Sequence, residues 1–538
     1  MPQSDAIDAL FVGWENQENL GLRYIMAFLH RCGYRTQLAP FFPGAEEEII
    51  RVAVETNPKL IGFSIIFQYN LNEFGNLMSA LRRAGIQSHF TAGGHYPSLC
   101  PVSTFEQLPE LNSVVRHEGE LTALELLENF DHPEIWNTIP GLAFRCGQNV
   151  VTNPPRALIE PLDFLPWPQR GDVLQAARGI PIAPMLASRG CLFDCSFCSI
   201  RQFYAGAPGP MRRSRSPRDV AKEMKDLYQT RRVRLFLFQD DDFASKTTAQ
   251  RRWVNEFLDA LDDEKLTGKI GWKISCRVDD IDRDIMQRCR ERGLRVVYLG
   301  VESGNADGLA VLNKRVSVER NLQAMRDITD AGLAFDMGFM LLEPATTFDT
   351  LRENISFLRV AASLGGPPLS FVKMLPLAGT SIQKQLEIEG RLTGDPVRPD
   401  YRFTDARLDN FALWITLRFS ARNSSSDGLV ERLRMAYFDH LVAQTFEPAP
   451  GVTEYGAAVR RLIDTANDSA LTTLERALAL AETCPDADCI AVKWRSLNDF
   501  AADDRAIQED IFSELDSILG QYSPGLCAAM RQSEPAFS

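Results

Sequence analysis

Three cysteines stand close together in the middle of the chain, in the sequence Cys191-Leu-Phe-Asp-Cys195-Ser-Phe-Cys198. They follow a predicted strand and Arg189-Gly190, so one loop can wrap three thiolates around a single iron–sulfur cluster. Four thiolates would saturate a [4Fe–4S] cube, whereas three leave one iron open to a further ligand. Three buried cysteines or a structural zinc site are the alternatives, but zinc needs a fourth ligand and no histidine is near in the sequence. We therefore expect a cluster with one open iron.

Alternating strands and helices must place this loop at one end of a sheet. A series of strand and helix patterns begins at Ile180. Its first helix is well marked, because Ser216 can cap it and Pro217 occupies its first position. Six strand–helix units predict a barrel or partial barrel, whose active site gathers at the carboxyl ends of the strands. The predicted strands span residues 183–188, 233–238, 270–276, 295–300, 334–341 and 370–375.

Residues 1–150 show an earlier series of the same kind. Apolar runs at 9–13 and 59–67 predict buried strands, and helical spacing follows each of them. Strict alternation predicts an α/β fold, a doubly wound Rossmann-like sheet with helices on both faces. Such a sheet binds ligands beyond the carboxyl ends of its strands. Residues 141–152 predict a β-hairpin that turns at Gly147.

The pattern changes at two points further along the chain. Prolines gather between Pro154 and Pro168, which predicts a linker over 151–178 between the first domain, 1–150, and a barrel domain, 179–396. From residue 397 the strand signals fade. A helical C-terminal domain is therefore expected over 397–538, where it would shape the substrate site. Its predicted helices span 429–444, 457–464, 471–483 and 503–519.

The composition disfavours several classes of partner. The chain has 538 residues, of which 45% are hydrophobic and 24% charged, and no apolar run is long enough for a membrane span. Its 58 basic and 71 acidic residues give a net charge of −13, which disfavours nucleic acid. The first residues lack the basic and long apolar regions of a signal peptide. We therefore expect a cytoplasmic protein whose 11 cysteines are not paired in disulfides.

The order and spacing of the three central cysteines match a known family. Cys-x3-Cys-x-aromatic-Cys after the first strand of a βα barrel resembles the radical S-adenosylmethionine (radical SAM) superfamily. The resemblance implies that Cys191, Cys195 and Cys198 hold a [4Fe–4S] cluster whose open iron binds SAM, which is then cleaved to a 5′-deoxyadenosyl radical. It places Phe197 near the adenine. It also implies an electron donor such as flavodoxin or ferredoxin.

Three further motifs end predicted strands where that family contacts SAM. By resemblance, Asp240 and Asp241 lie near the methionine amino group, Arg277 near the carboxylate and Glu302 near the ribose. A solvated loop for the aspartates and a helix cap for Glu302 are the structural alternatives. After the fifth strand many members carry Gly-x-Pro-x-Glu-Thr, whereas residues 342–347 read Leu-Glu-Pro-Ala-Thr-Thr. No adenine contact is therefore assigned there.

The N-terminal domain resembles the cobalamin-binding branch of the same superfamily. The matching pieces are Asn-Leu-Gly at the first helix, Gly-Phe-Ser in the third strand, a Gly-Gly-x-x-Pro-Ser loop and an acidic Glu-Gly-Glu. The family motif for the last piece is Gly-Glu-Gly-Glu, and His117 stands here in place of its first glycine. Glycines at strand ends let a large flat ligand approach the backbone. The resemblance implies that cobalamin contacts Trp14, Asn19, Gly21, Ser64, Gln68, Tyr69, Gly93, Gly94, His95, Tyr96, Glu118, Gly119 and Glu120.

The environment of the cobalt is left open by the sequence. No Asp-x-His-x-x-Gly motif is present, so no histidine from that motif ligates the metal. His95 is a conceivable substitute, but packing within its own loop is the favoured role. Trp14, Gln68 and Tyr69 either cover the corrin face or belong to the core and rim.

By resemblance, the leading function is methylation of an unactivated carbon. One SAM methylates cobalamin, a second SAM gives the 5′-deoxyadenosyl radical, and the substrate radical takes the methyl group from methylcobalamin. The cofactors carry the difficult chemistry, while the protein orients them and excludes water. A rearranging or cyclising enzyme with the same cofactors is the alternative. Because no appended peptide- or RNA-binding motif is visible, the expected substrate is a small specialised metabolite.

Two other functional classes fit the sequence less well. A tRNA methylthiotransferase carries a second cysteine trio in its N-terminal domain, but Cys32, Cys100 and Cys146 are widely spread and the chain is acidic. A non-catalytic cobalamin-binding protein would have no use for an open-site cluster motif. Three further cysteines lack the tight spacing of an auxiliary cluster and are expected to be core or surface thiols: Cys484, Cys489 and Cys527.

Overall fold

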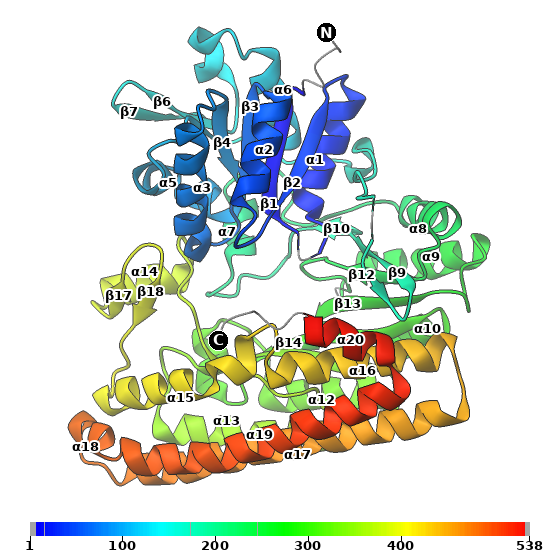
Figure 1. Ribbon diagram of the computed structural model, residues 1–538, viewed down its shortest axis with the longest axis vertical. Coiled ribbons are helices and arrows are strands. Elements are labelled where there is room, and N and C mark those ends of the chain that lie inside the picture. The colour runs from blue at the N-terminus through cyan, green and yellow to red at the C-terminus, as the bar shows by residue number, and fades with distance from the viewer. Residues whose placement is uncertain (1–6, 16, 173, 245, 533–538) are drawn as a thin grey trace. The chain divides into compact units, whose positions relative to one another are not determined.

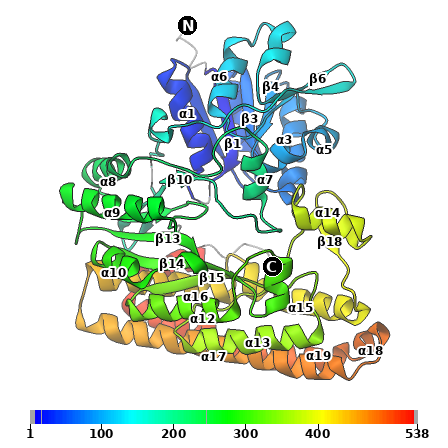
Figure 2. The ribbon, with the colours of Figure 1, turned by 180° about the vertical axis from the view of Figure 1, so that it is seen from behind.

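A computed structural model describes residues 7–15, 17–172, 174–244 and 246–532 of the chain. The chain divides into two compact units. Unit 1 consists of residues 1–174, 184–223 and 375–401, and unit 2 of residues 175–183, 224–374 and 402–538. Each unit has its own sheet and its own hydrophobic cores, and Figures 1 and 2 label their elements from opposite sides.

The sheet of unit 1 has seven strands in the order β2-β1-β3-β4-β5-β6-β7. Strands β1 to β5 run parallel, and β6 and β7 add an antiparallel hairpin. The order reverses between β1 and β3, the switch point at which doubly wound sheets bind their ligands. The predicted alternation and the hairpin turn at Gly147, with φ of 62°, are confirmed. The strands are β1 (Ala9–Trp14), β2 (Thr36–Phe41), β3 (Leu60–Ser64), β4 (His89–Gly93), β5 (Ser113–Val115), β6 (Leu142–Cys146) and β7 (Asn149–Thr152).

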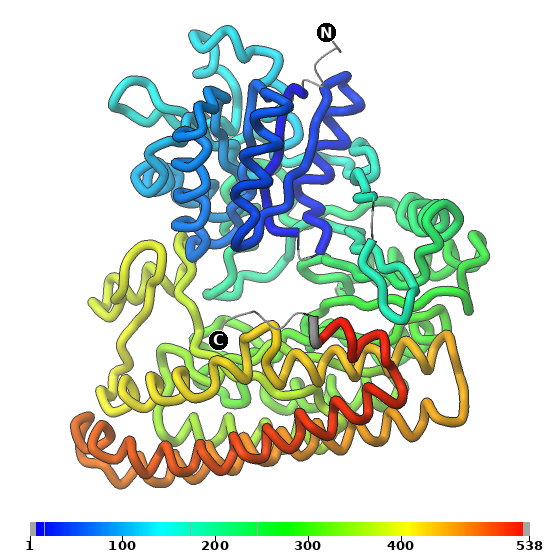
Figure 3. The backbone as a smooth tube through the Cα atoms, in the orientation of Figure 1, coloured from blue at the N-terminus to red at the C-terminus, as the bar shows by residue number. Residues whose placement is uncertain are grey.

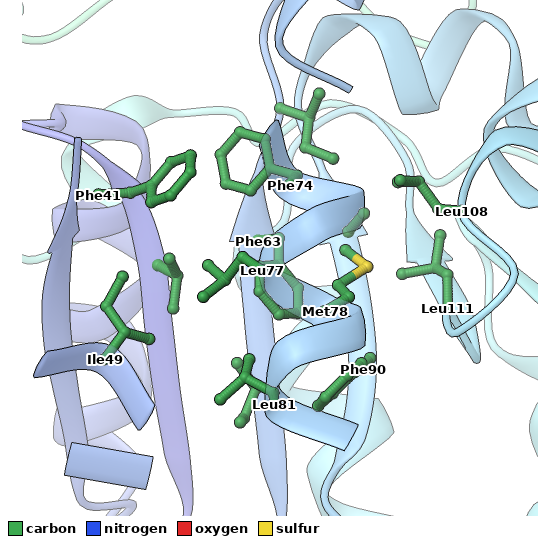
Figure 4. Packing of buried hydrophobic residues seen from close by; sticks show 14 of the residues in the cluster. Phe41, Ile49, Phe63, Phe74, Leu77, Met78, Leu81, Phe90, Leu108 and Leu111 are labelled. Carbon is green, nitrogen blue, oxygen red and sulfur yellow. The ribbon is translucent and has the colours of Figure 1, made fainter. Parts of the chain in front are cut away.

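Helices cover both faces of this sheet, which explains why β1 and β3 read as unbroken apolar runs. One core packs α2, α3 and α5 on one face, and Figure 4 shows Phe63 and Phe90 of the sheet against Phe74 and Met78 of α3. A second core packs α1 and α6 on the other face. Asn19 caps α1 by accepting a hydrogen bond from the Leu22 N–H. The helices are α1 (Leu20–Arg31), α2 (Glu46–Thr56), α3 (Leu71–Arg83), α4 (His95–Leu99), α5 (Pro101–Gln107) and α6 (Glu120–Glu128), with 3₁₀ turns η1 (Gln68–Asn70), η2 (Pro133–Thr138) and η3 (Leu162–Phe164).

Unit 1 also contains two segments from later in the chain. The first, 184–223, holds the three-cysteine loop, and the second, 375–401, is a short helix with a β-hairpin (Figure 3). Ser216 accepts a hydrogen bond from the Asp219 N–H, and the helix begins at Pro217, as predicted. The elements are β10 (Ser188–Arg189), α7 (Ser199–Ala205), β11 (Arg213–Ser214), α8 (Pro217–Arg231), α14 (Ser381–Ile388), β17 (Leu392–Gly394) and β18 (Pro399–Tyr401).

The second sheet is open, with the strand order β16-β15-β14-β13-β12-β9-β8. Strands β12 to β16 run parallel, and β8 pairs antiparallel with β9 at the edge. The predicted partial barrel is confirmed, but its last strand, expected over 370–375, is only two residues long. Its strands are β8 (Ala176–Ala177), β9 (Ile180–Met185), β12 (Leu235–Phe238), β13 (Gly271–Arg277), β14 (Leu294–Glu302), β15 (Ala334–Leu342) and β16 (Val372–Lys373). Its helices are α9 (Thr248–Asp263), α10 (Arg283–Glu291), α11 (Ala306–Val311), α12 (Val318–Asp330) and α13 (Phe348–Ser363), with the turn η4 (Val278–Asp280).

The C-terminal region is helical, as predicted, but its helices are longer than expected. The helices predicted at 457–464 and 471–483 are one continuous helix, α17. The residues between the two predicted helices are polar, which interrupts the apolar pattern. Asn467 and Ser469 are nevertheless buried there, because they are hydrogen-bonded to Leu369 and Asp504. None of the helices in the described residues combines the length and apolar character that a membrane crossing requires. The helices are α15 (Ala406–Ser424), which the sequence pattern missed, α16 (Leu429–Phe446), α17 (Pro450–Glu482), α18 (Ala487–Val492), α19 (Trp494–Tyr522) and α20 (Pro524–Gln532).

Candidate functional site

The three-cysteine loop lies between β10 and α7. Gly190 precedes it with φ of 85°, and a Cβ at this position would lie 1.9 Å from the carbonyl oxygen of Met211. Only glycine therefore lets the chain turn here. The Cys198 N–H donates to the Cys195 carbonyl at 3.2 Å, and α7 begins at the next residue. The backbone thus folds into a tight turn between two of the three thiols.

The donor set of this loop fits an iron–sulfur cluster. Cys191, Cys195 and Cys198 are all half-buried, and so is Phe197. Thiolate is the usual protein ligand of such clusters, and three of them leave one iron for another ligand. These residues would hold the cluster, and the predicted place of Phe197 beside the adenine stays a prediction.

Acidic residues after β5 bind the arginines that flank the loop. Glu118 accepts hydrogen bonds from Arg189 at 3.0 Å and from Arg213 at 2.9 Å, and Glu120 accepts one from Arg189 at 2.7 Å. All of these side chains are largely buried. Burial alone would raise the pKa of Glu118, but the two guanidinium groups hold it below its ordinary value. Both carboxylates, predicted to contact cobalamin, thus fasten the cluster loop to the N-terminal sheet.

A histidine pair makes a second link between the same two regions. His95 Nδ1 lies 3.0 Å from the Ser199 hydroxyl, and its ring stacks on Phe203 with centroids 4.5 Å apart. His117 Nδ1 lies 2.7 Å from the Phe203 carbonyl. Burial and the neighbouring His117 lower the pKa of His95 to about 4, and burial and Arg116 do the same to His117. Both rings are therefore neutral at pH 7, and His95 packs on α7 rather than within its own loop.

The β1–β3 switch point gathers several of the residues predicted for cobalamin. The Asn19 amide donates to the Trp14 carbonyl and to the Ser64 hydroxyl, each at 3.4 Å. The indole N–H of Trp14 is buried and has no hydrogen-bond partner among the described residues. Just beyond β3, Gln68 is buried, whereas Tyr69 is exposed and stacks on Phe67. An unmet donor and an exposed aromatic face at a ligand-binding edge fit a large, flat, polar-edged group such as cobalamin.

The other residues that were predicted to contact cobalamin differ in burial and in backbone conformation. Tyr96 is buried in the core, and its hydroxyl bonds to Ser103 at 3.0 Å. Gly94 has φ of 114°, and a Cβ there would lie 2.3 Å from the Ile65 carbonyl oxygen. Backbone geometry is therefore enough to explain this glycine. Three glycines lie at or beside a strand end or helix start without a ligand-specific feature: Gly21, Gly93 and Gly119.

In unit 2, two predicted SAM-binding residues belong to one buried network. Arg277 donates to the Lys314 carbonyl at 2.5 Å and to Asp279 at 2.9 Å. The ammonium group of Lys314 lies 3.4 Å from the Glu302 carboxylate. Glu302 has φ of 69°, an unfavourable conformation for a residue with a side chain. Lys314 thus joins Arg277 to Glu302 at the carboxyl ends of β13 and β14, a link that no motif in the sequence announced.

The aspartates after β12 separate into buried and exposed positions. Asp240 is buried and Asp241 is exposed, so only part of the predicted solvated-loop alternative applies. Asp242 and Asp280 are both buried, at 0% and 4% exposure. Burial and the neighbouring Asp242 carboxyl raise the pKa of Asp280 to about 8. This carboxyl pair was missed because 38 residues separate its members in the sequence, which gave no spacing signal.

The segment after β15, whose sequence departs from the expected motif, forms a hydrogen-bonded turn. Glu343 is fully buried, and its carboxylate accepts hydrogen bonds from the Ala345 N–H at 2.6 Å and the Thr346 hydroxyl at 3.2 Å. The Thr346 hydroxyl also accepts from the Glu343 N–H at 2.9 Å. The Leu-Glu-Pro-Ala-Thr-Thr sequence therefore closes on itself as a turn before α13.

The three C-terminal cysteines, expected to be core or surface thiols, are buried or half-buried. Cys527 belongs to the core of the helical region, Cys484 is buried and Cys489 is half-buried. Burial and the neighbouring Cys489 raise the pKa of Cys484 to about 11. Within the described residues, no three His, Cys, Asp or Glu side chains gather around a single-ion site.

Two parts of the chain match known domain families. Residues 185–358 match the radical SAM superfamily, and residues 15–127 match the B12 binding domain. Among curated proteins, an uncharacterized methyltransferase of Pyrococcus horikoshii is 29% identical over 271 residues, which cover 50% of this chain and 57% of that protein. The anaerobic magnesium-protoporphyrin IX monomethyl ester cyclase of Cereibacter sphaeroides is 28% identical over 272 residues, covering 49% of this chain and 43% of the cyclase. The chain thus spans about half the length of these relatives.

A solved structure extends the likeness in fold to nearly the whole chain. The cobalamin-dependent S-adenosylmethionine radical enzyme OxsB, with aqua-cobalamin and SAM bound, aligns with a TM-score of 0.72 and 15% identity. The alignment covers 98% of this chain and 83% of OxsB. A radical SAM domain implies a [4Fe–4S] cluster, SAM, a substrate and a reductant, and a B12-binding domain implies cobalamin. The chain therefore joins a B12-binding domain to a radical SAM domain.

Proposed function

We propose that the chain is a cobalamin-dependent radical SAM methyltransferase that acts on an unactivated carbon of a small specialised metabolite. The observation that carries the proposal is that unit 1 contains both the three-cysteine loop and the β1–β3 switch point. Direct contacts join the loop to strand ends of the same sheet: His95, which follows β4, lies 3.0 Å from Ser199, which follows the last of the three cysteines. A reaction that needs both a cluster and a cobalamin is favoured when the two predicted sites belong to one folded unit.

The residues of the chain have binding and positioning roles in this proposal. When bound, the cluster and SAM supply a hydrogen-abstracting radical, and cobalamin supplies the methyl group. Arg277 and Glu302 would bind the polar groups of SAM, and Lys314 holds both in place. The exposed aromatic ring of Tyr69 would pack on the corrin and exclude water from it. No side chain is assigned as a general base.

Rearrangement or cyclisation with the same cofactors is the second candidate. The similarity to a magnesium-protoporphyrin ester cyclase supports keeping it. The two candidates differ in the fate of one methyl group, because only the methyltransferase moves it from SAM to the product. A methyl label on SAM therefore separates them.

The first experiment is anaerobic purification and reconstitution, followed by assays for iron, sulfide and cobalamin. We expect about four irons and one cobalamin per chain, as a [4Fe–4S] cluster and a single corrin site require. The protein is then incubated with reductant, trideuteromethyl-SAM and a small-molecule extract, and mass spectrometry searches for products that gain the labelled methyl group. Cleavage of SAM without any labelled product would favour the second candidate. Four irons without cobalamin affinity would overturn both.

A matched pair of cysteine variants tests the cluster assignment. Cys195→Ala removes one predicted ligand, so the iron content and SAM cleavage should fall to background while cobalamin remains bound. Cys146→Ala removes an exposed thiol at the end of β6 and should change neither. Full SAM cleavage by Cys195→Ala would rule out the proposed cluster site.

A further inference from the structure

A seven-residue segment of unit 1 touches both the predicted cobalamin edge and the cluster loop. It comprises residues 376–382, Pro-Leu-Ala-Gly-Thr-Ser-Ile, and is called the strap here. At its start, the Ala378 N–H donates to the Gln68 side-chain oxygen at 2.8 Å. At its end, the Ile382 N–H and the Ser381 hydroxyl both donate to the Ser196 carbonyl, each at 3.1 Å. Gln68 follows β3, and Ser196 lies between two cluster cysteines.

The strap has little freedom of its own. Thr380 is fully buried and bonds back to the Leu377 carbonyl through its hydroxyl at 2.6 Å and its N–H at 3.2 Å. Gly379 has φ of 81°, and a Cβ there would meet the Leu99 side chain of α4 at 3.1 Å. Only four residues separate the two anchoring nitrogens, so they lie at most roughly 14 Å apart. The strap is therefore a short, folded connection that is held in shape by its own hydrogen bonds and by packing against α4.

The bonds to Ser196 fix the path of the cluster loop. A backbone carbonyl has two lone pairs, and the two strap donors can occupy both. Because the peptide unit is planar, a carbonyl turned toward α14 points the following Phe197 N–H in the opposite direction. The strap thus sets the orientation of one peptide dipole between Cys195 and Cys198. Peptide dipoles and hydrogen bonds near a cluster tune its reduction potential.

We infer that the strap is a positioning element that couples Gln68, on the predicted cobalamin side, to the cluster loop through Ser196. The inference rests on the proposed function for the identity of the two cofactors. Gln68, Ser381 and the Ile382 N–H are its positioning groups, and none of them is a metal ligand. A change at the Gln68 anchor is felt at the cluster, although Gln68 belongs to a different strand end.

The cluster end is tested with Ser381→Ala and Ile382→Pro. Ile382 is the second residue of α14, where the helix does not need the N–H, so proline removes the donor at tolerable cost to the helix. Ile382→Val keeps the donor and is the control. In anaerobically reconstituted protein we expect a shifted cluster midpoint potential and altered electron paramagnetic resonance for Ser381→Ala, a larger change for Ile382→Pro, and neither for Ile382→Val. If Ile382→Pro does not fold, Ser381→Ala alone decides, and a wild-type potential and spectrum would overturn the inference.

The coupling is tested with Gln68→Leu and Gln68→Glu. Leucine cannot accept the Ala378 N–H, whereas glutamate can. We expect Gln68→Leu to shift the cluster signal in the same direction as Ser381→Ala, and Gln68→Glu to keep the wild-type signal. An unchanged cluster signal in Gln68→Leu would show that the anchors act independently and would overturn the coupling. These measurements need no substrate, so a failed search for methylated products would count against the proposed function and leave the strap result intact.

Discussion

The strand-end charges of the two units are held in different ways. In unit 1, Glu118 and Glu120 bind arginines that flank the cluster loop, and Glu118 binds two of them. In unit 2, Lys314 joins Arg277 to Glu302, because it offers its carbonyl to one and its ammonium group to the other. The acids of unit 1 therefore fasten structure, whereas those of unit 2 stay at the strand ends, where SAM is proposed to bind.

The largest effect that this contrast predicts is in the stability of unit 1. Glu118→Gln leaves Arg189 and Arg213 buried beside a neutral side chain, and breaking such a pair costs about 3–5 kcal/mol. Urea unfolding followed by circular dichroism measures the loss. Glu120→Gln is the matched variant and should cost less, because Glu120 binds one arginine. Equal losses would show that the second arginine of Glu118 contributes nothing.

In unit 2 the corresponding change should affect ligand binding before stability. If Glu302 binds the ribose of SAM, Glu302→Gln replaces a charged acceptor by a neutral one. The expected loss is roughly tenfold in affinity, equivalent to about 1.4 kcal/mol. Equilibrium binding of SAM to the reconstituted protein measures it, and the iron content serves as the control. An unchanged affinity for SAM would mean that Glu302, like Glu118, has a structural role and does not bind SAM.

A third prediction concerns the buried Asp242–Asp280 pair of unit 2. The raised pKa of Asp280, about 8, means that the folded state keeps a proton that the unfolded state has released above about pH 4. Stability is therefore greatest below about pH 4 for this group and is lost as the pH rises toward 8. Asp280→Asn removes this dependence, and its melting temperature at pH 8 should exceed the wild-type value by on the order of 2–4 °C. A wild-type slope between pH 5 and 8 in the variant would assign the proton elsewhere.

The smallest effect is expected on the surface of unit 1. Arg51 pairs with Glu48 and Glu55 along α2, and all three side chains are more than half exposed. Exposed pairs are screened by water and salt and contribute little. Glu48→Gln should leave the urea unfolding curve unchanged. A clear shift of the unfolding curve would mean that an exposed ion pair of this unit contributes to stability as the buried pairs do.

The sequence was sufficient where periodicity, a glycine or a helix-start proline carries the signal. The apolar runs of β1 and β3, the hairpin at Gly147 and the helix start at Pro217 were all predicted correctly. Prediction failed where buried polar contacts replace apolar ones. Asn467 and Ser469 interrupt the helical pattern of α17 because they bond to Leu369 and Asp504, which are distant in sequence.

The candidate site shows the same limit. The three cysteines of the loop are local in sequence, so their spacing was enough to predict them as cluster ligands. The roles of Glu118 and Lys314 depend on partners such as Arg213 and Arg277, which lie 95 and 37 residues away. No spacing rule could pair them, because only the folded sheets bring their strand ends and loops together. The strap likewise could not be predicted from the sequence, because Ala378 and Gln68 are 310 residues apart.

The segment 184–223 has a consequence for modularity. The radical SAM match begins at residue 185, yet the first 39 residues of that match fold with the B12-binding domain. In a chimera that joins this radical SAM region to a foreign N-terminal domain, Arg189 and Arg213 would lose the carboxylates of Glu118 and Glu120. A chimera that is to keep these ion pairs must therefore carry Glu118 and Glu120 together with the cysteine loop.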